Sequence, residues 1–114
     1  MRYLLPAILL LAIFAATPLQ TTASEEYLSP RAYLYATAPF PEWQDATIWC
    51  ESRWQPDATN PYSGAAGVAQ FMWPTWYWAE DAYGIYGSPY DPWTAIDMMN
   101  ALWLDGYYYW WDCA

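Results

Sequence analysis

The chain has 114 residues, which limits it to one domain at most. It carries twelve acidic side chains against three arginines, has no lysine or histidine, and its formal net charge is -9 at pH 7. A phosphate backbone would strongly repel such a chain, so the charge balance argues against a nucleic-acid-binding protein. The acidic side chains also keep the surface soluble in a chain that is 22% aromatic.

The first 23 residues have the features of a signal peptide. Arg2 precedes an apolar run over residues 4–16, and the small residues 21–23 suit cleavage before Ser24. The run of about 13 residues is shorter than the roughly 20 that a membrane helix needs, which disfavours the alternative of a permanent anchor. We therefore expect an exported protein without a stable membrane span.

Residues 24–41 are predicted to be a tether that precedes the domain. Pro30, Pro39 and Pro41 interrupt this segment, which leaves room for one short helical turn over residues 31–37. We expect the segment to be loosely ordered or to wrap the domain, and to carry no chemistry.

A helix is predicted to follow Pro41, because acidic residues in its first turns suit the helix dipole. Its buried stripe at helical spacing comprises Trp43, Ala46, Thr47, Cys50 and Trp54. Glu51 lies about 100° around the helix from Cys50, at the edge of this stripe. Burial beside apolar groups such as Trp54 raises a carboxyl pKa, as a general acid near neutral pH requires. The alternative is a surface glutamate paired with Arg53 or unpaired.

Cys50 and Cys113 are the only cysteines, and in an exported protein we expect them to form a disulfide. Closing a loop of about 60 residues would stabilise the fold by about 4 kcal/mol. Metal ligation is the alternative, but two cysteines without histidine make a poor zinc site. We expect neither a metal nor a cofactor.

Turn-forming residues dominate the stretch from Gln55 to Gly67, where glycines allow the backbone to approach a ligand closely. Residues 68–72 are predicted to start a second helix, and Pro74 to begin another that stops at Gly84. Three aromatic rings near this helix are candidates for stacking on a bound ligand, with core packing as the alternative for each. These rings are Trp76, Trp78 and Tyr83.

The last helix has the clearest boundaries, with Asp91 as N-cap, Pro92 at its first position and Gly106 just past its end. Its inward face is predicted to comprise Ala95, Ile96, Met99, Leu102 and Trp103, and its outward face Thr94, Asp97 and Asp105. The tail over residues 107–113 is expected to be a compact turn packed on the core, rather than a separate binding element.

The stretch from Cys50 to Trp76 resembles the active-site half of the soluble lytic transglycosylase and goose-type lysozyme superfamily. The matching residues are Glu51, Ser52, Ala58, Pro61, Gly64, Ala65, Gly67, Val68, Ala69, Gln70, Pro74 and Thr75. They stand in the family's order at nearly its spacing, with one extra residue around Tyr62 and Ser63. The order of several short motifs is a more specific signal than any one of them alone.

This resemblance implies a mainly α, small lysozyme-like domain over residues 42–114. Its parts would be a catalytic helix, an irregular glycine-rich substrate loop and packed C-terminal helices, stapled by one disulfide. In the family a loop serine bonds the catalytic acid and a glutamine contacts the N-acetyl sugar. Gln70 matches that glutamine, while Ser63 and Asn60 compete for the serine's place.

The activity implied is cleavage of the bond between N-acetylmuramic acid and N-acetylglucosamine in peptidoglycan glycan strands, with Glu51 as general acid and base. We expect a monomer that is secreted or located in the cell wall or periplasm.

The chain departs from the family at its end, because it lacks the usual Y-N-x-G motif and closes on WWDCA. In this it resembles short exported or phage-associated members. No second carboxylate is evident, since Asp57 lies in a turn, Asp91 in a cap and Asp97 on an outward face. Transglycosylase and hydrolase chemistry therefore stay open, and a non-catalytic module that binds peptidoglycan or scaffolds wall machinery is the alternative.

Overall fold

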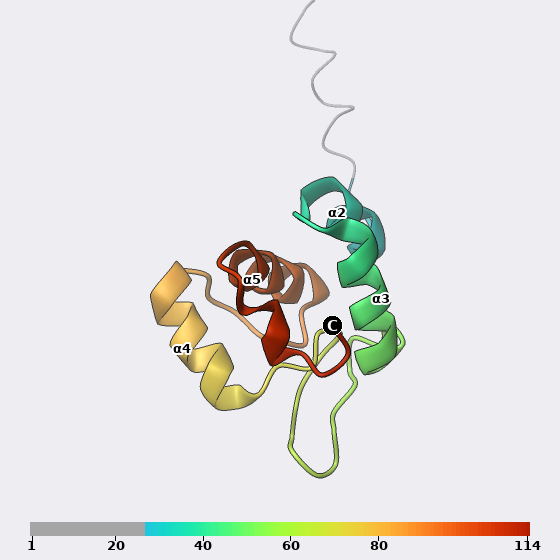
Figure 1. Ribbon diagram of the computed structural model, residues 1–114. Coiled ribbons are helices and arrows are strands. Elements are labelled where there is room, and N and C mark those ends of the chain that lie inside the picture. The colour runs from blue at the N-terminus through green and yellow to red at the C-terminus, as the bar shows by residue number, and fades with distance from the viewer. Residues whose placement is uncertain (1–26) are drawn as a thin grey trace, which may run out of the picture.

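The computed structural model describes residues 27–114, which fold as a set of helices around one core (Figure 1). The elements are α2 (Pro30–Thr37), α3 (Pro41–Ser52), α4 (Trp73–Tyr83), α5 (Pro92–Leu104) and the 3-10 turn η2 (Tyr107–Trp110). Over the same residues β-structure is limited to isolated bridges. The prediction of a mainly α fold is confirmed, whereas the predicted signal peptide, residues 1–23, lies outside the described residues.

Proline and glycine set the helix boundaries. Each of the four α-helices has a proline in its first turn, where the missing N–H leaves no hydrogen bond unmade. Gly84 ends α4 in the left-handed conformation, with φ of 67°, as predicted. Asp91 precedes α5 as predicted, but its carboxylate accepts the Thr94 hydroxyl at 2.5 Å rather than a backbone N–H.

Helix α5 is the centre of the fold and contacts α2, α4 and η2 (Figure 1). Its buried residues are Ala95, Ile96, Met98, Met99, Leu102 and Trp103. They include the whole predicted inward face, and burying a large apolar side chain stabilises a fold by roughly 1.5–3 kcal/mol. Helices α2 and α4 and the η2 turn are therefore positioned on α5, whereas α3 packs on α2.

The predicted buried stripe of α3 is wrong for three of its five residues, since Thr47 is buried and Trp54 is partly buried against the core. Trp43, Ala46 and Cys50 are exposed, and polar side chains at neighbouring positions are buried instead. The buried residues of α3 are Gln44, Asp45, Thr47, Ile48 and Ser52. Polar groups can be buried when they find hydrogen-bond partners. The Nε2 group of Gln44 donates to the Oδ1 atom of Asn100 in α5 at 2.8 Å. Apolar periodicity could not reveal such partners.

Asp45 joins α3 to α2. Its carboxylate accepts hydrogen bonds from Arg31 at 2.7 Å, from the Tyr35 hydroxyl at 2.6 Å and from the Trp54 indole at 2.8 Å. Burial opposes the charged form of Asp45, but these three donors outweigh it and hold the pKa of the carboxyl below its usual value. Leu34 of α2 is fully buried as well. Residues 24–41 were expected either to be loosely ordered or to wrap the domain. The described part of this segment wraps the domain, because α2 packs against it.

No second helix forms over residues 68–72, contrary to prediction. The chain turns back instead, because Ala66 and Phe71 exchange both backbone hydrogen bonds at 3.0 Å in an antiparallel bridge. Gly67 and Gln70 have positive φ values of 79° and 52°, which a right-handed helix does not allow.

Within residues 27–114 none of the helices has the length and apolar character that crossing a membrane requires.

Candidate active site

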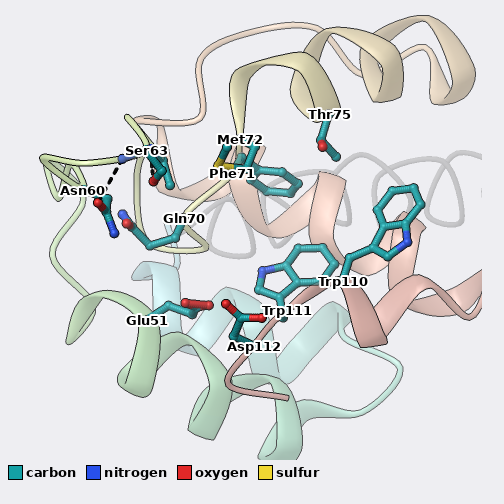
Figure 2. A pocket seen from close by; sticks show the side chains of 11 residues that line it. Glu51, Asn60, Ser63, Gln70, Phe71, Met72, Thr75, Trp110, Trp111 and Asp112 are labelled. Atoms are coloured by element: carbon teal, nitrogen blue, oxygen red, sulfur yellow. Dashed lines mark hydrogen bonds between the residues drawn. The ribbon is translucent and has the colours of Figure 1, made fainter.

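Glu51 lies in the last turn of α3 at the wall of a pocket of about 320 Å³ (Figure 2). Three further parts of the chain complete the pocket: the glycine-rich loop, the start of α4 and the C-terminal tail. The other lining residues are Asn60, Ser63, Ala65, Gln70, Phe71, Met72, Thr75, Trp110, Trp111 and Asp112. The site is thus assembled from segments far apart in the sequence.

Ser52 attaches the end of α3 to the glycine-rich loop. Its buried hydroxyl donates to the carbonyl oxygen of Val68 at 2.6 Å, and Ile48 O lies within 3.2 Å of the same hydroxyl. Successive helical side chains point about 100° apart, so Glu51 is turned from this contact into the pocket. The glutamate and serine of the sequence motif therefore have separate tasks, because the serine holds the loop and the glutamate faces the cavity.

Two effects favour the protonated form of Glu51. Burial raises the pKa of its carboxyl, and the negative charge of Asp112 raises it further. The two carboxyl groups lie side by side at the edge of the pocket in Figure 2. Trp54, the apolar neighbour expected from the sequence, bonds Asp45 instead. The large apolar groups that line the pocket are Phe71, Met72, Trp110 and Trp111.

The alternative of a surface ion pair does not describe Glu51. Arg53 instead lies over the indole of Trp49, with its guanidinium carbon 4.9 Å from the ring centroid. Among residues 27–114 the one ion pair joins Arg31 and Asp45. No hydrogen bond in this part of the chain engages the Glu51 carboxyl, which leaves it available to a ligand.

Asn60 and Ser63 both line the pocket, and both shape the loop. The Asn60 side-chain oxygen accepts from the backbone N–H groups of Tyr62 at 2.8 Å and Ser63 at 3.1 Å, which closes an Asx turn. The Ser63 hydroxyl oxygen accepts from the N–H of Ala65 at 3.2 Å. Neither side chain bonds Glu51, so both remain candidates for ligand contact.

Gln70 lines the pocket with its side-chain amide already anchored. The Nε2 group donates to the carbonyl oxygens of Ala58 at 3.1 Å and Gly67 at 2.9 Å. Both amide hydrogens are therefore used within the loop, and the Oε1 atom is the part of the side chain left to accept a hydrogen bond.

Gly67 is where the loop passes closest to the connection between α4 and α5. A Cβ atom added there would lie 1.9 Å from the carbonyl oxygen of Pro89, and the φ of 79° disfavours any other residue. Gly64 has a similar φ of 75°, but a Cβ there would meet nothing within 4 Å. Both glycines are needed for their positive φ, but only Gly67 is also needed because a side chain there would clash with Pro89.

We predict that Gly67→Ala lowers the free energy of unfolding by about 3 kcal/mol and Gly64→Ala by about 1 kcal/mol. Only the first change forces the loop away from Pro89, whereas both carry the cost of a left-handed alanine. Urea denaturation of the two variants and the parent protein measures the difference. Equal midpoints for the two variants would contradict the close packing at Gly67.

The C-terminal tail contributes to the pocket, which the sequence did not lead us to expect. The predicted disulfide between Cys50 and Cys113 is present and joins residues 63 positions apart. The Trp111 indole is buried and donates to the carbonyl oxygen of Ala69 at 2.8 Å. Since Cys113 is linked to the neighbour of Glu51, its own neighbour Asp112 is held at the same pocket. That pairing was the signal in the sequence that could have identified Asp112.

The aromatic candidates are distributed differently from prediction. Trp76 is 0% exposed, its indole donates to the carbonyl oxygen of Gly87 at 3.1 Å, and it has no surface to offer a ligand. Tyr83 does not line the pocket, and its hydroxyl donates to Asp105 at 2.6 Å. Trp78 is the candidate whose ring remains open, at 46% exposed.

Residues 27–114 thus form a small helical domain that one disulfide crosslinks. It has an open pocket with a half-buried carboxyl in its wall. The chain belongs to the family described as the Transglycosylase SLT domain, whose sequence profile matches residues 41–108. The matched segment contains Glu51 and the glycine-rich loop, and it ends before Trp110. No curated protein and no solved structure matches the chain significantly.

Family membership confirms the resemblance noted from the sequence. An SLT domain suggests a transglycosylase-like function that concerns peptidoglycan, in keeping with a location at the cell wall.

Proposed function

We propose that the protein is exported and cleaves the glycosidic bond between N-acetylmuramic acid and N-acetylglucosamine in peptidoglycan, as a lytic transglycosylase or a lysozyme. The observation that carries this proposal is the half-buried carboxyl of Glu51 at the wall of the pocket in an SLT domain, without a hydrogen-bond partner among residues 27–114. A carboxyl whose pKa is raised by burial has the property that a glycosidase needs in its general acid.

Glu51 donates its proton to the glycosidic oxygen while the bond to the anomeric carbon breaks and positive charge develops on the sugar ring. The negative charge of Asp112 beside Glu51 favours that positive charge. The Glu51 carboxylate then takes a proton from the oxygen that attacks the anomeric carbon. This oxygen is the sugar's own 6-hydroxyl in a transglycosylase and water in a lysozyme.

Mass spectrometry of the fragments released from purified peptidoglycan tests the proposal. Fragments lighter by one water than the hydrolysis products identify a transglycosylase, because the 6-hydroxyl has closed an anhydro ring. Fragments with a free reducing end identify a lysozyme. If the protein sediments with peptidoglycan but releases no fragment, the proposed cleavage is refuted and the protein is a non-catalytic peptidoglycan-binding module.

We predict that Asp112→Asn moves the alkaline limb of the pH profile of kcat/KM to lower pH. The general acid must be protonated, so activity falls as the pH rises through the pKa of Glu51. The Asp112 charge raises that pKa, and its removal therefore lowers the pH at which activity is lost. Asp112 is the other titratable group that lines the pocket.

Asp57→Asn is the matched control for this experiment, because Asp57 is exposed and does not line the pocket. Its alkaline limb should coincide with that of the parent protein. An unchanged limb in Asp112→Asn, or equal shifts in both variants, would contradict an action of Asp112 on Glu51.

A further inference from the structure

A second, shallower hollow of about 240 Å³ adjoins the Glu51 pocket. Its lining residues are Pro74, Thr75, Trp78 and Trp110. Thr75 and Trp110 also line the Glu51 pocket, so the two hollows share a wall. In Figure 2, Thr75 and Trp110 lie on the side of the pocket away from Asn60 and Ser63. The surface open to a ligand thus continues from Glu51 toward Trp78, along the first turns of α4.

Two tryptophan rings dominate the second hollow. Trp78 is 46% exposed and Trp110 is 43% exposed, with ring centroids 5.8 Å apart and an interplanar angle of 62°. Tyr107 supports both rings from the core side, since its ring centroid lies 4.4 Å from that of Trp110 and 6.1 Å from that of Trp78. Rings fixed by neighbours lose little rotamer freedom when a ligand binds.

The chemistry of this hollow selects the class of ligand. No charged side chain lines it, so it offers no ion-pair partner to the ends or charged groups of a peptide. The chain's net charge of -9 disfavours a polyanion. A pyranose ring with an apolar C–H face and a polar edge matches a tryptophan face bordered by a threonine hydroxyl and water.

We propose that Trp78 and Trp110 form a carbohydrate subsite, which binds sugar units of the glycan strand beyond those held at Glu51. This inference rests on the proposed function, because it extends the same strand along the surface. It assigns the glycan path to the side of α4 and gives the tail a part in binding. Trp110 of the Tyr107–Trp110 turn and Trp78 of α4 bind the sugar together. The family profile matches residues 41–108 and therefore does not include Trp110.

Binding of soluble N-acetylglucosamine oligomers, measured by titration calorimetry, tests the subsite. The host is the full chain with Glu51→Gln, which separates binding from cleavage. We expect the hexamer to bind this host more tightly than the trimer. Adding Trp78→Ala should lower the affinity for the hexamer about tenfold and change that for the trimer much less, since stacking on one ring is lost.

Trp49→Ala is the matched control, because Trp49 is 54% exposed and lines neither hollow of this groove. It should leave the ratio of hexamer to trimer affinity unchanged. Trp78→Leu keeps apolar contact with Tyr107 while it removes the flat ring, so it should reproduce the tenfold loss even if the alanine variant unfolds.

An unchanged ratio in Trp78→Leu, or a host that binds hexamer and trimer equally, would overturn the subsite. A host that shows the expected length dependence while the parent protein releases no fragment from peptidoglycan would keep the subsite and overturn only the proposed cleavage.

Discussion

Glu51→Gln is expected to lower kcat/KM for peptidoglycan cleavage by about 10²- to 10⁴-fold, the contribution of a positioned general acid. Glutamine has nearly the shape of glutamate but has no proton to give to the leaving oxygen. Release of soluble fragments from purified peptidoglycan over time measures the loss. Binding to peptidoglycan should persist, because the loop and the aromatic walls of the pocket are unchanged.

The same substitution should not destabilise the fold. The Glu51 carboxyl is half-buried, accepts no hydrogen bond from residues 27–114, and lies beside the like charge of Asp112. Removal of an unpaired charge from such a site leaves the free energy of unfolding unchanged or higher. Glu42→Gln is the control, since Glu42 lies exposed in the first turn of the same helix. A Glu51→Gln protein that keeps parental activity would refute the proposed mechanism.

Removal of the disulfide is expected to lower the free energy of unfolding by about 4 kcal/mol. The bridge closes a loop whose ends are 63 residues apart, and the chain-entropy estimate for such a loop is about 4 kcal/mol. Small domains unfold with a total of about 5–15 kcal/mol, so this loss is a large part of the stability. Chemical denaturation of the parent protein and of the double variant Cys50→Ser with Cys113→Ser measures it.

The double variant should also lose activity under conditions where it is still folded. Asp112 precedes Cys113 directly, and no other covalent link holds it beside Glu51. Parent protein treated with a reductant is the control and should behave like the double variant. Equal denaturation midpoints for oxidised parent and double variant would contradict the expected stabilisation.

The starts of α3, α4 and α5 and the end of α4 could be predicted from the sequence, because they depend on local chemistry. Proline in a first turn and glycine with positive φ act through the sterics of their own backbone, as at Pro92 and Gly84. The apolar face of α5 is similarly a property of one helix. The glutamate–serine motif and the glycine-rich loop indicated the family, which the profile match confirms, and they are the basis for proposing Glu51 as the acid.

The inner face of α3 was decided by tertiary structure. Asp45 is buried because Arg31, Tyr35 and Trp54 all reach it, and Gln44 is buried because Asn100 meets it from α5. The energy of a buried polar group depends on partners that come from other elements. A periodicity computed along one helix contains no information about them.

The walls of the site were decided in the same way. Trp76 and Trp78 are two residues apart on one helix, yet packing against the core covers the first and leaves the second open. Asp112 reaches Glu51 only because the disulfide returns the tail to the end of α3. The sequence by itself therefore determined where α3, α4 and α5 begin and which cysteines pair, and it supplied the candidate acid Glu51. The tertiary structure decided which distant side chains surround that acid, because burial and electrostatic contact depend on distances in space.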